Sequence, residues 1–258
     1  MPYCNAANTR VHYRVAGEGA PVALVHGVVF DAEGTWGGLV DSFTDKHTVI
    51  LPDYAGTAKA EDDGGELTVE ALTEQVVAAI EAAAQGPVDL VGFSLGAVVS
   101  ASVAATRPDL VRRLVLAAGW ARPDDEYLRN LMTLWAGLED DASFGRLGTL
   151  TAFSRGFLNT VGREQVEAII AGGERTEGGA RQVDLARRAD IRELLPRVEA
   201  ETLVIGCAQD ATIPVELTRE LHTAIQGSTY QELDCGHVAV IEKGPEFVKL
   251  VQEFIERP

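Results

Sequence analysis

Cysteine, aromatic residues and metal-ligand patterns are all scarce in this 258-residue chain. Its three cysteines, Cys4, Cys207 and Cys235, are an odd number at scattered positions, which excludes a disulfide framework and indicates reduced thiols. Aromatic residues make up 6% of the chain, so Ala, Val and Leu must build most of its core. No residues have the spacing that is typical of a metal site. We therefore expect neither a metal nor an organic cofactor.

The chain also lacks an excess of positive charge and long apolar runs. The chain has 22 Lys and Arg residues against 39 Asp and Glu residues, a net charge of −17, and no run of five basic residues. Nucleic acids and anionic membranes bind patches of Lys and Arg, so the charge argues against both as partners. No run of 18 apolar residues is present, and Met1–Asn5 lacks the basic and apolar regions of a secretory signal. We expect a soluble, cytoplasmic protein that acts on a small molecule, and no pattern indicates its oligomeric state.

Short apolar runs bounded by Gly and Pro alternate with helical patterns along most of the chain. The expected strands are Val11–Val15, at an edge of the sheet, and then Val22–Val25, Thr48–Leu51, Pro87–Val91, Leu114–Ala118, Thr202–Gly206 and Thr229–Leu233. The helices expected among them are Thr68–Ala84, Leu95–Thr106, Val215–Ile225 and Pro245–Ile255. This alternation predicts an α/β fold, in which a mostly parallel central sheet carries helices on both faces.

The stretch from Gly119 to Val198 breaks this alternation. It contains no convincing strand, and apolar side chains recur in it at helical spacing: Leu128, Leu131, Met132, Trp135 and Leu138. We predict a helical lid at residues 119–198, inserted into a core formed by residues 1–118 and 199–258. A helical subdomain without any role at the functional site is the alternative.

The motif Gly92-Phe93-Ser94-Leu95-Gly96 lies where an expected strand turns sharply into an expected helix. Side chains at positions 92 and 96 would collide with the neighbouring strand and helix, which accounts for the two glycines. Ser94 would then be exposed above the sheet, with a helix N-terminus beneath it that favours developing negative charge. Because the chain holds 26 glycines, an incidental serine in a glycine-rich turn is the alternative.

A serine nucleophile needs a base that removes its proton and an acid that orients this base. After Ser94 the chain offers Asp210 and His237, each just past the end of an expected strand. Since open parallel sheets gather catalytic groups at the carboxyl ends of their strands, this placement favours a serine–acid–histidine triad. Three rival acids remain: Asp234, which we interpret as a turn residue, and the pair Asp124 and Asp125.

Acyl transfer also requires two backbone N–H groups that stabilise an oxyanion. One is expected from Leu95, the residue that follows the serine. The other is expected from the loop after Val22–Val25, where Gly27 lets the backbone approach the site. The amide of Val28 is the best-placed donor in that loop.

Over essentially its whole length the chain resembles the α/β-hydrolase fold superfamily. The segments that carry the resemblance are His26-Gly27, Pro52-Asp53-Tyr54-Ala55-Gly56, Gly92–Gly96, Asp210 with Pro214, and Gly236-His237. The chain is most similar to ester and lactone hydrolases with a helical cap after the sixth strand. The resemblance implies a Ser94–His237–Asp210 triad and an oxyanion hole at Val28 and Leu95. Haloalkane dehalogenases and epoxide hydrolases of this family use an aspartate nucleophile, so Ser94 argues against both activities.

The expected function is hydrolysis of a carboxylic ester, lactone or thioester of a small to medium, largely apolar substrate, through an acyl-enzyme on Ser94. We expect the substrate to contact Val29, Phe30, Trp120, Trp135 and Phe157, although Trp135 fits a place in the lid core equally well. Two alternatives stay open. One is a non-hydrolytic enzyme of the same fold, such as a cyclase, an acyltransferase or a cofactor-free perhydrolase, and the other is a ligand-binding protein without turnover.

Overall fold

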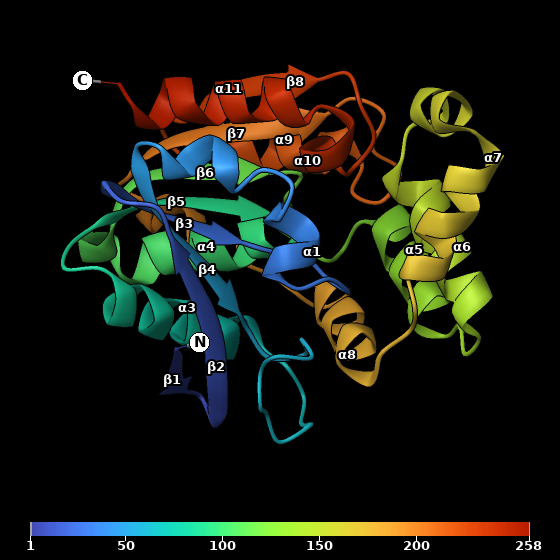
Figure 1. The fold of residues 1–258 in the computed structure, drawn as a ribbon, viewed down its shortest axis with the longest axis horizontal. Helices are drawn as coiled ribbons and strands as arrows, with labels where there is room; N and C mark the ends of the chain where they lie inside the picture. The colour runs from blue at the N-terminus through green and yellow to red at the C-terminus, as the bar shows by residue number, and fades with distance from the viewer. Residues whose placement is uncertain (1, 258) are drawn as a thin grey trace.

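An eight-stranded sheet runs through the centre of the molecule, with helices on both of its faces (Figure 1). The computed structural model describes residues 2–257. The strands lie in the order β1-β2-β4-β3-β5-β6-β7-β8; β1–β2 and β2–β4 pair antiparallel, and all other pairs are parallel. Their bounds are β1 Tyr3–Ala6, β2 Thr9–Ala16, β3 Ala20–Val25, β4 His47–Asp53, β5 Val88–Phe93, β6 Val111–Ala117, β7 Glu201–Cys207 and β8 Thr229–Leu233. The predicted α/β class with a mostly parallel sheet is confirmed.

The helices fall into three groups. On one face of the sheet pack α3 (Val69–Ala83), α4 (Leu95–Thr106) and α9 (Val215–Ala224), and on the other pack α1 (Ala32–Trp36), α2 (Asp41–Thr44), α10 (Ala239–Glu242) and α11 (Gly244–Ile255). Between β6 and β7 the chain forms α5 (Glu126–Ala136), α6 (Asp141–Ala152), α7 (Arg155–Gly172) and α8 (Glu177–Ala186). Two short 3₁₀ helices, η1 (Pro108–Leu110) and η2 (Leu195–Arg197), complete the set. In Figure 1, α5, α6 and α7 lie beyond one end of the sheet.

Two apolar cores form because side chains alternate along the central strands. Ala23 and Val25 of β3 enter the core on the α4 side, whereas Val22 and Leu24 enter the core on the α11 side. Helix α4 is buried from Leu95 to Ala105 and carries mainly Ala, Val and Ser, so its backbone can approach the sheet closely. A fully buried Val or Leu side chain stabilises the fold by about 1.5–3 kcal/mol. The central strands are therefore rigid supports for the loops that follow them.

The N-terminal edge of the sheet differs from the sequence-based expectation. The segment Val11–Val15 lies within β2, which pairs with β1 on one side and β4 on the other, so its prediction as an edge strand was wrong. The true edge is β1, whose residues are exposed or half-buried. A short strand without a buried apolar face leaves no clear pattern in the sequence.

The helices between β6 and β7 each begin at a side-chain cap. Asp125, Asp140, Ser154 and Thr176 accept a hydrogen bond from an amide in the first turn of α5, α6, α7 and α8, respectively. Helix α7 is interrupted at Gly162 (φ +80°). A glycine at positive φ explains why the sequence pattern is broken there.

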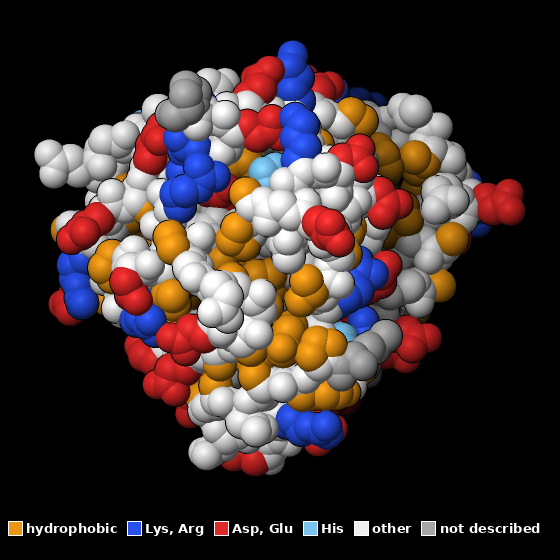
Figure 2. Space-filling model, turned by 60° about the vertical axis from the view of Figure 1, so that its left-hand side comes forward, with side chains coloured by type: hydrophobic (Ala, Val, Ile, Leu, Met, Phe, Trp, Pro, Cys, Tyr) orange, Lys and Arg blue, Asp and Glu red, His pale blue; other side chains and the backbone are white. Residues whose placement is uncertain are grey.

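The surface carries acidic and basic side chains next to one another, around exposed apolar side chains, on the face that Figure 2 shows. Exposed ion pairs such as Arg10–Glu61 (2.6 Å) and Lys46–Glu256 (2.8 Å) are typical. Pairs of this kind contribute at most about 1 kcal/mol each, so they affect solubility more than folding. Within residues 2–257, no helix combines the length and the apolar character needed to cross a membrane.

Candidate active site

The site is built on the turn between β5 and α4, where Ser94 stands. Its backbone adopts φ +56° and ψ −122°, a strained conformation for a residue with a side chain. The amide of Ser94 donates to the carbonyl of Ala117 (2.9 Å), which fixes the turn. A Cβ atom at Gly92 would lie 2.3 Å from the carbonyl oxygen of Gly96, and one at Gly96 would lie 2.3 Å from that of His26. These close approaches explain both glycines of the motif.

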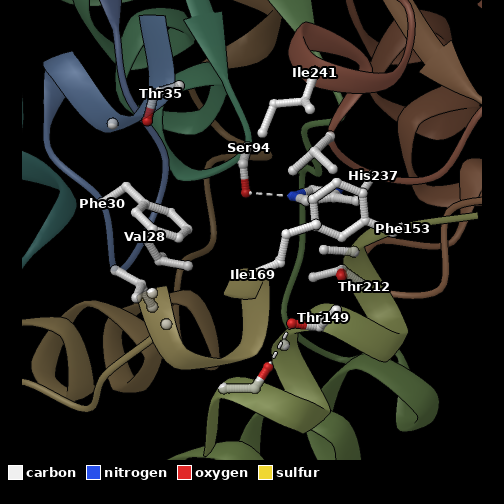
Figure 3. Close-up of a pocket in the computed structure, with 18 of the residues that line it drawn as sticks. Val28, Phe30, Thr35, Ser94, Thr149, Phe153, Ile169, Thr212, His237 and Ile241 are labelled. Carbon is white, nitrogen blue, oxygen red and sulfur yellow. Dashed lines mark hydrogen bonds between the residues drawn. The ribbon is translucent and has the colours of Figure 1, made fainter. Parts of the chain in front are cut away.

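His237 bridges Ser94 and Asp210. Its Nε2 lies 2.9 Å from Ser94 Oγ (Figure 3), and its Nδ1 lies 2.7 Å from Asp210 Oδ2. Because Nδ1 faces a carboxylate, it carries the ring proton, so Nε2 is free to accept the hydroxyl proton of Ser94. All three side chains are buried, with exposed fractions of 6% for His237 and 1% for Asp210. The structure thus brings together the three residues that the sequence placed far apart.

Asp210 uses both of its carboxylate oxygens. While Oδ2 accepts from His237, Oδ1 accepts from the amides of Thr212 (2.8 Å) and Ile213 (2.7 Å). These bonds hold the carboxylate in one orientation at the start of the loop after β7. The backbone amides of this loop therefore orient Asp210 toward the histidine.

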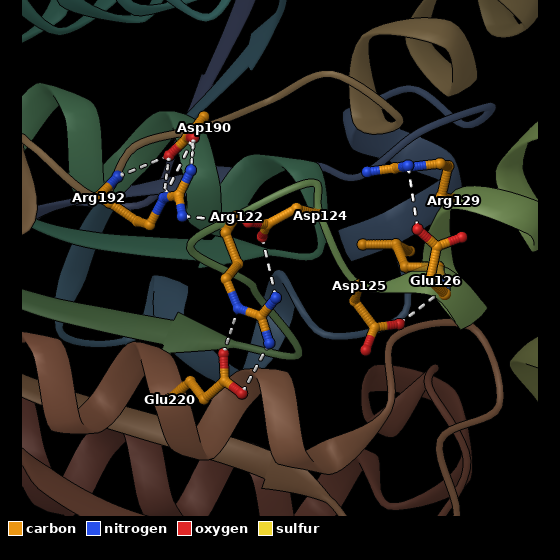
Figure 4. A network of polar contacts seen from close by, with 9 residues as sticks. Arg122, Asp124, Asp125, Glu126, Arg129, Asp190, Arg192 and Glu220 are labelled. Atoms are coloured by element: carbon orange, nitrogen blue, oxygen red, sulfur yellow. Dashed lines mark hydrogen bonds and ion pairs between the residues drawn. The ribbon is translucent and has the colours of Figure 1, made fainter.

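The rival acids have other partners. Asp234 accepts from the exposed side chain of Gln209 (2.6 Å). Asp124 pairs with Arg122 (2.9 Å) and Arg192 (3.2 Å) at the surface, and Asp125 caps α5 by accepting from the Leu128 amide (2.8 Å) (Figure 4). Hydrogen bonding to Arg122 lowers the pKa of Asp124. Among the carboxylates weighed for this role, Asp210 is the one in contact with His237.

Two backbone amides beside Ser94 have no acceptor. Within the described part of the chain, neither the N–H of Val28 nor that of Leu95 donates to another protein atom. Unpaired amides next to a serine hydroxyl are what an oxyanion requires. Tyr54 holds the loop that carries Val28 in place, because its Oη lies within hydrogen-bonding distance of the carbonyls of His26 (2.7 Å) and Gly27 (3.0 Å) and donates to them.

His26 completes this brace. Its ring stacks on that of Tyr54 with centroids 3.8 Å apart, and its Nδ1–H donates to the Gly27 carbonyl (2.7 Å). The side chain is fully buried, and this burial lowers the pKa of His26. The imidazole therefore packs as a neutral ring against the turn that follows β3. We call residues 26–30 the oxyanion loop, after the role that we propose for them below.

Known proteins match this chain over nearly all of its length. A family model described as the alpha/beta hydrolase family matches residues 22–250. The chain belongs to the alpha/beta hydrolase family. A pyrrolizixenacetamide deacetylase from Xenorhabdus hominickii is 40% identical over 99% of this hydrolase and 98% of the relative. A putative carbamate hydrolase, RutD, from Azorhizobium caulinodans is 26% identical over 92% and 91% of the two chains. The solved enol-lactonase from Burkholderia xenovorans superposes with a TM-score of 0.87 at 25% identity, covering 99% of this chain and all of the other.

A cavity of about 580 Å³ opens in front of Ser94 and His237 in this hydrolase (Figure 3). Its walls come from the oxyanion loop, from α5, α6 and α7, and from the segment after His237. The described lining residues include no Asp, Glu, Lys or Arg side chain. Four of the predicted substrate contacts lie along it: Val29, Phe30, Trp135 and Phe157. Among residues 2–257, no group of three or more His, Cys, Asp or Glu side chains is arranged to hold a metal ion.

Trp120 does not belong to this cavity. Its side chain is 1% exposed and packs in the core on the α4 side, and the residue is not among those that line the cavity. The geometry therefore contradicts its predicted contact with substrate. Its position just after β6 suggested the site, but position along the chain does not show in which direction a side chain points.

Sequence reasoning missed most of the apolar wall and its polar side chains, which are Thr35, Thr149, Gln165 and Thr212. The wall includes Phe153 between α6 and α7, Ile169 on α7 and Ile241 on α10 (Figure 3). Thr212 also lines it, with a side chain that is 2% exposed and an Oγ1 that has no partner among the described residues. Its place two residues after Asp210 was the available signal.

The turn that carries His237 is fixed to the helices above it. Glu242 accepts from the amide (2.6 Å) and the hydroxyl (2.7 Å) of Ser154, and from the amide of Gly236 (3.3 Å). In addition, the Val238 amide donates to the carbonyl of Ala152 (3.2 Å). These bonds cross from α10 and the histidine turn to the junction of α6 and α7. The same contacts therefore hold the base and the roof of the cavity.

Proposed function

We propose that this protein is a serine hydrolase that cleaves ester or amide bonds of small, neutral, largely apolar substrates through an acyl-enzyme on Ser94. The observation that carries the proposal is the chain of contacts from Ser94 Oγ to His237 and on to Asp210, which opens onto a cavity whose described lining includes no Asp, Glu, Lys or Arg side chain. The family and its named hydrolase relatives support a hydrolase that acts on ester- or amide-type bonds.

In the proposed reaction, Ser94 Oγ attacks the substrate carbonyl carbon while His237 Nε2 takes the hydroxyl proton. The amides of Val28 and Leu95 hold the oxyanion, and Asp210 stabilises the imidazolium. His237 then returns the proton to the departing alcohol or amine, which leaves the acyl group on Ser94. Water, deprotonated by His237, attacks the acyl carbon, and the acid product leaves as Ser94 recovers its proton.

The substrate class follows from the cavity and the relatives together. An apolar cavity of about 580 Å³ suits a small molecule without formal charge, since burying an unpaired charge there would be costly. The sequence alone favoured esters, lactones and thioesters. The deacetylase that is 40% identical adds amides, because its name refers to an acetamide. We propose that the helices of residues 119–198 serve as a lid that selects the acyl and leaving groups.

Labelling with a fluorophosphonate, followed by mass spectrometry, tests the nucleophile. We expect one adduct per chain on Ser94, no adduct in Ser94→Ala, and a loss of kcat on the order of 10⁶-fold in that variant. The folded state should change little, because the substitution removes a single oxygen. A Ser94→Ala variant that kept most of its activity would exclude the mechanism, and an unlabelled wild-type protein would favour a ligand-binding role.

The bond type is tested by comparing nitrophenyl esters, lactones and nitroanilides of the same acyl groups. We expect turnover of neutral short-chain acyl compounds and little turnover when the acyl group carries a charge. Hydrolysis in ¹⁸O-labelled water should place one label in the acid product. Transfer of the acyl group to an added alcohol or amine instead, with no labelled acid, would identify an acyltransferase.

A further inference from the structure

We propose that Gln182, on helix α8, is a positioning residue that holds the oxyanion loop in its active shape through Val29. The inference rests on the function proposed above, since it concerns the Val28 amide as an oxyanion donor. Gln182 itself does not line the cavity and does not touch the reacting atoms. It would act on catalysis only by fixing the backbone beside Val28.

Both ends of the Gln182 amide are engaged. Its Oε1 accepts from the Val29 amide (2.9 Å), and its Nε2 donates to the carbonyl of Ala55 (3.1 Å). The side chain is completely buried. If the amide were flipped, its NH₂ group would face the Val29 N–H and its oxygen would face the Ala55 carbonyl oxygen. Both pairs would repel each other, so the contacts allow one orientation only.

Val29 adopts a conformation that needs such support. Its φ is +72°, a rare and strained value for a β-branched residue, and Phe30 N donates to the Val28 carbonyl across it (2.8 Å). This three-residue γ-turn with a positive central φ is strained. If the turn relaxed, the peptide that follows Val28 would rotate, and the Val28 amide would shift relative to Ser94.

Helix α8 is itself fixed to the sheet domain, so Gln182 is a rigid support. Arg181 pairs with the largely buried carboxylate of Asp62 (2.8 Å) and donates to the carbonyl of Gly65 (2.8 Å). A Cβ at Gly178 would lie only 2.2 Å from the carbonyl oxygen of Gly56, so the two backbones are in close contact. The oxyanion loop is thus braced by a helix that follows the cavity-lining helices in the chain.

A matched pair of substitutions tests this role. Gln182→Met keeps the length of the side chain and removes both hydrogen bonds. Gln75→Met removes the bonds of another buried glutamine, which accepts from the amide of the same Ala55 (2.8 Å) and donates to Thr9 (3.0 Å) but does not touch the loop. We expect both variants to lose stability, and only Gln182→Met to lose kcat, by about 10- to 100-fold with KM little changed.

A second substitution separates positioning from general damage. Glycine adopts positive φ without strain, so in a Val29→Gly background the Gln182→Met change should cost several-fold less in kcat than it does with valine present. Equal kcat losses in Gln182→Met and Gln75→Met, or an undiminished loss in the Val29→Gly background, would overturn the proposal.

Hydrogen exchange in the wild-type protein provides a test that does not depend on any variant folding. The Val29 amide should exchange slowly because Gln182 accepts from it, whereas the neighbouring Val28 amide should exchange quickly. Fast exchange at both amides would overturn the inference. Failure of the proposed function would look different, because Ser94 would then not react with the fluorophosphonate. Labelling of Ser94 with unchanged kcat in Gln182→Met would overturn the positioning role alone.

Discussion

At the scale of single residues, the carboxylate of Asp210 differs from its neighbours in how its oxygens are used. One oxygen accepts from His237 and the other from two backbone amides. Asp234 sits three residues from His237 in sequence, yet its carboxylate contacts Gln209. Proximity along the chain is thus a poor guide to which acid serves a histidine, and the hydrogen-bond partners are a better one.

This difference predicts unequal effects of the same substitution. Asp210→Asn should lower kcat by about 10⁴-fold near neutral pH, since an amide favours the wrong tautomer of the imidazole. Asp234→Asn, the matched control, should lower it far less. Steady-state kinetics on one ester substrate measures both. If Asp234→Asn lost most of its activity while Asp210→Asn stayed active, Asp234 would be the acid that orients His237.

The contacts of His237 with Ser94 and Asp210 could be predicted from the sequence because each of the three residues follows an apolar strand with clear boundaries. Ser94 also lies between two glycines whose steric role is local. The contacts of Gln182 with Val29 and of Glu242 with Ser154 could not be predicted, because neither Gln182 nor Glu242 follows a strand end or belongs to a motif that indicates its partner. Trp120 shows the same limit, since a pattern of apolar residues does not separate the core from the cavity wall.

At the scale of elements, α5, α6 and α7 form the roof of the cavity through aromatic contacts. Trp135 of α5 packs against Phe144 of α6 with ring centroids 5.4 Å apart, and Phe153 stacks on Phe157 of α7 at 5.1 Å. Trp135 is 7% exposed, whereas Phe157 is only half-buried. Trp135 therefore both fills the core of these helices and reaches the cavity, and the two roles foreseen for it are compatible.

We expect the roof to select substrates by size. Phe157→Ala should enlarge the cavity and raise kcat/KM for long-chain esters relative to acetyl esters, with fluorophosphonate labelling of Ser94 unchanged. Trp135→Ala should do the same but also destabilise the protein by about 3–5 kcal/mol, because a buried aromatic side chain is lost. A series of nitrophenyl esters measures the ranking. If neither variant altered it, selection would have to occur at Val29 and Phe30 in the oxyanion loop.

The junction between α10 and the α6–α7 turn gives a second prediction at this scale. Glu242→Ala leaves the amides of Ser154 and Gly236 without acceptors, which should cost about 1–3 kcal/mol of unfolding free energy and lower kcat, because the turn that carries His237 loosens. Glu246→Ala, which removes an exposed carboxylate paired with Lys243, should change stability by less than about 0.5 kcal/mol. Urea denaturation and kinetics on both variants measure the contrast. Unchanged kcat in Glu242→Ala would show that the histidine turn does not depend on this contact.

At the scale of the whole molecule, one buried histidine links stability to pH. Burial lowers the pKa of His26 below its value in the unfolded chain. As the pH falls through the unfolded value, near 6.5, the unfolded chain takes up a proton that the folded chain does not, and stability is lost. Above that value the contribution of His26 to stability is complete.

The slope of stability against pH tests this linkage. Between pH 7.5 and 5.5 the unfolding free energy should decrease by up to about 1.4 kcal/mol per pH unit from this group, and His26→Gln should flatten the curve. His222→Gln, which changes a half-buried histidine bonded to Ser228, is the matched control. Urea denaturation at several pH values measures the slopes. An identical slope in wild type and His26→Gln would exclude His26 as the source.

Ion pairs and hydrogen bonds join the segment between β6 and β7 to the rest of the protein at points spread along its length. Near the start of this segment, Arg122 pairs with Glu220 on α9 (2.7 Å, Figure 4). In the middle Ser154 donates to Glu242, and near the end Gln182 accepts from the Val29 amide. Replacing residues 119–198 with the matching segment of a relative is one way to change substrate specificity. In this chain, the replacement segment would also have to supply the groups that hold the histidine turn and the oxyanion loop. Chimeras that keep the residues at positions 154 and 182 should therefore stay active more often than those that exchange the segment whole.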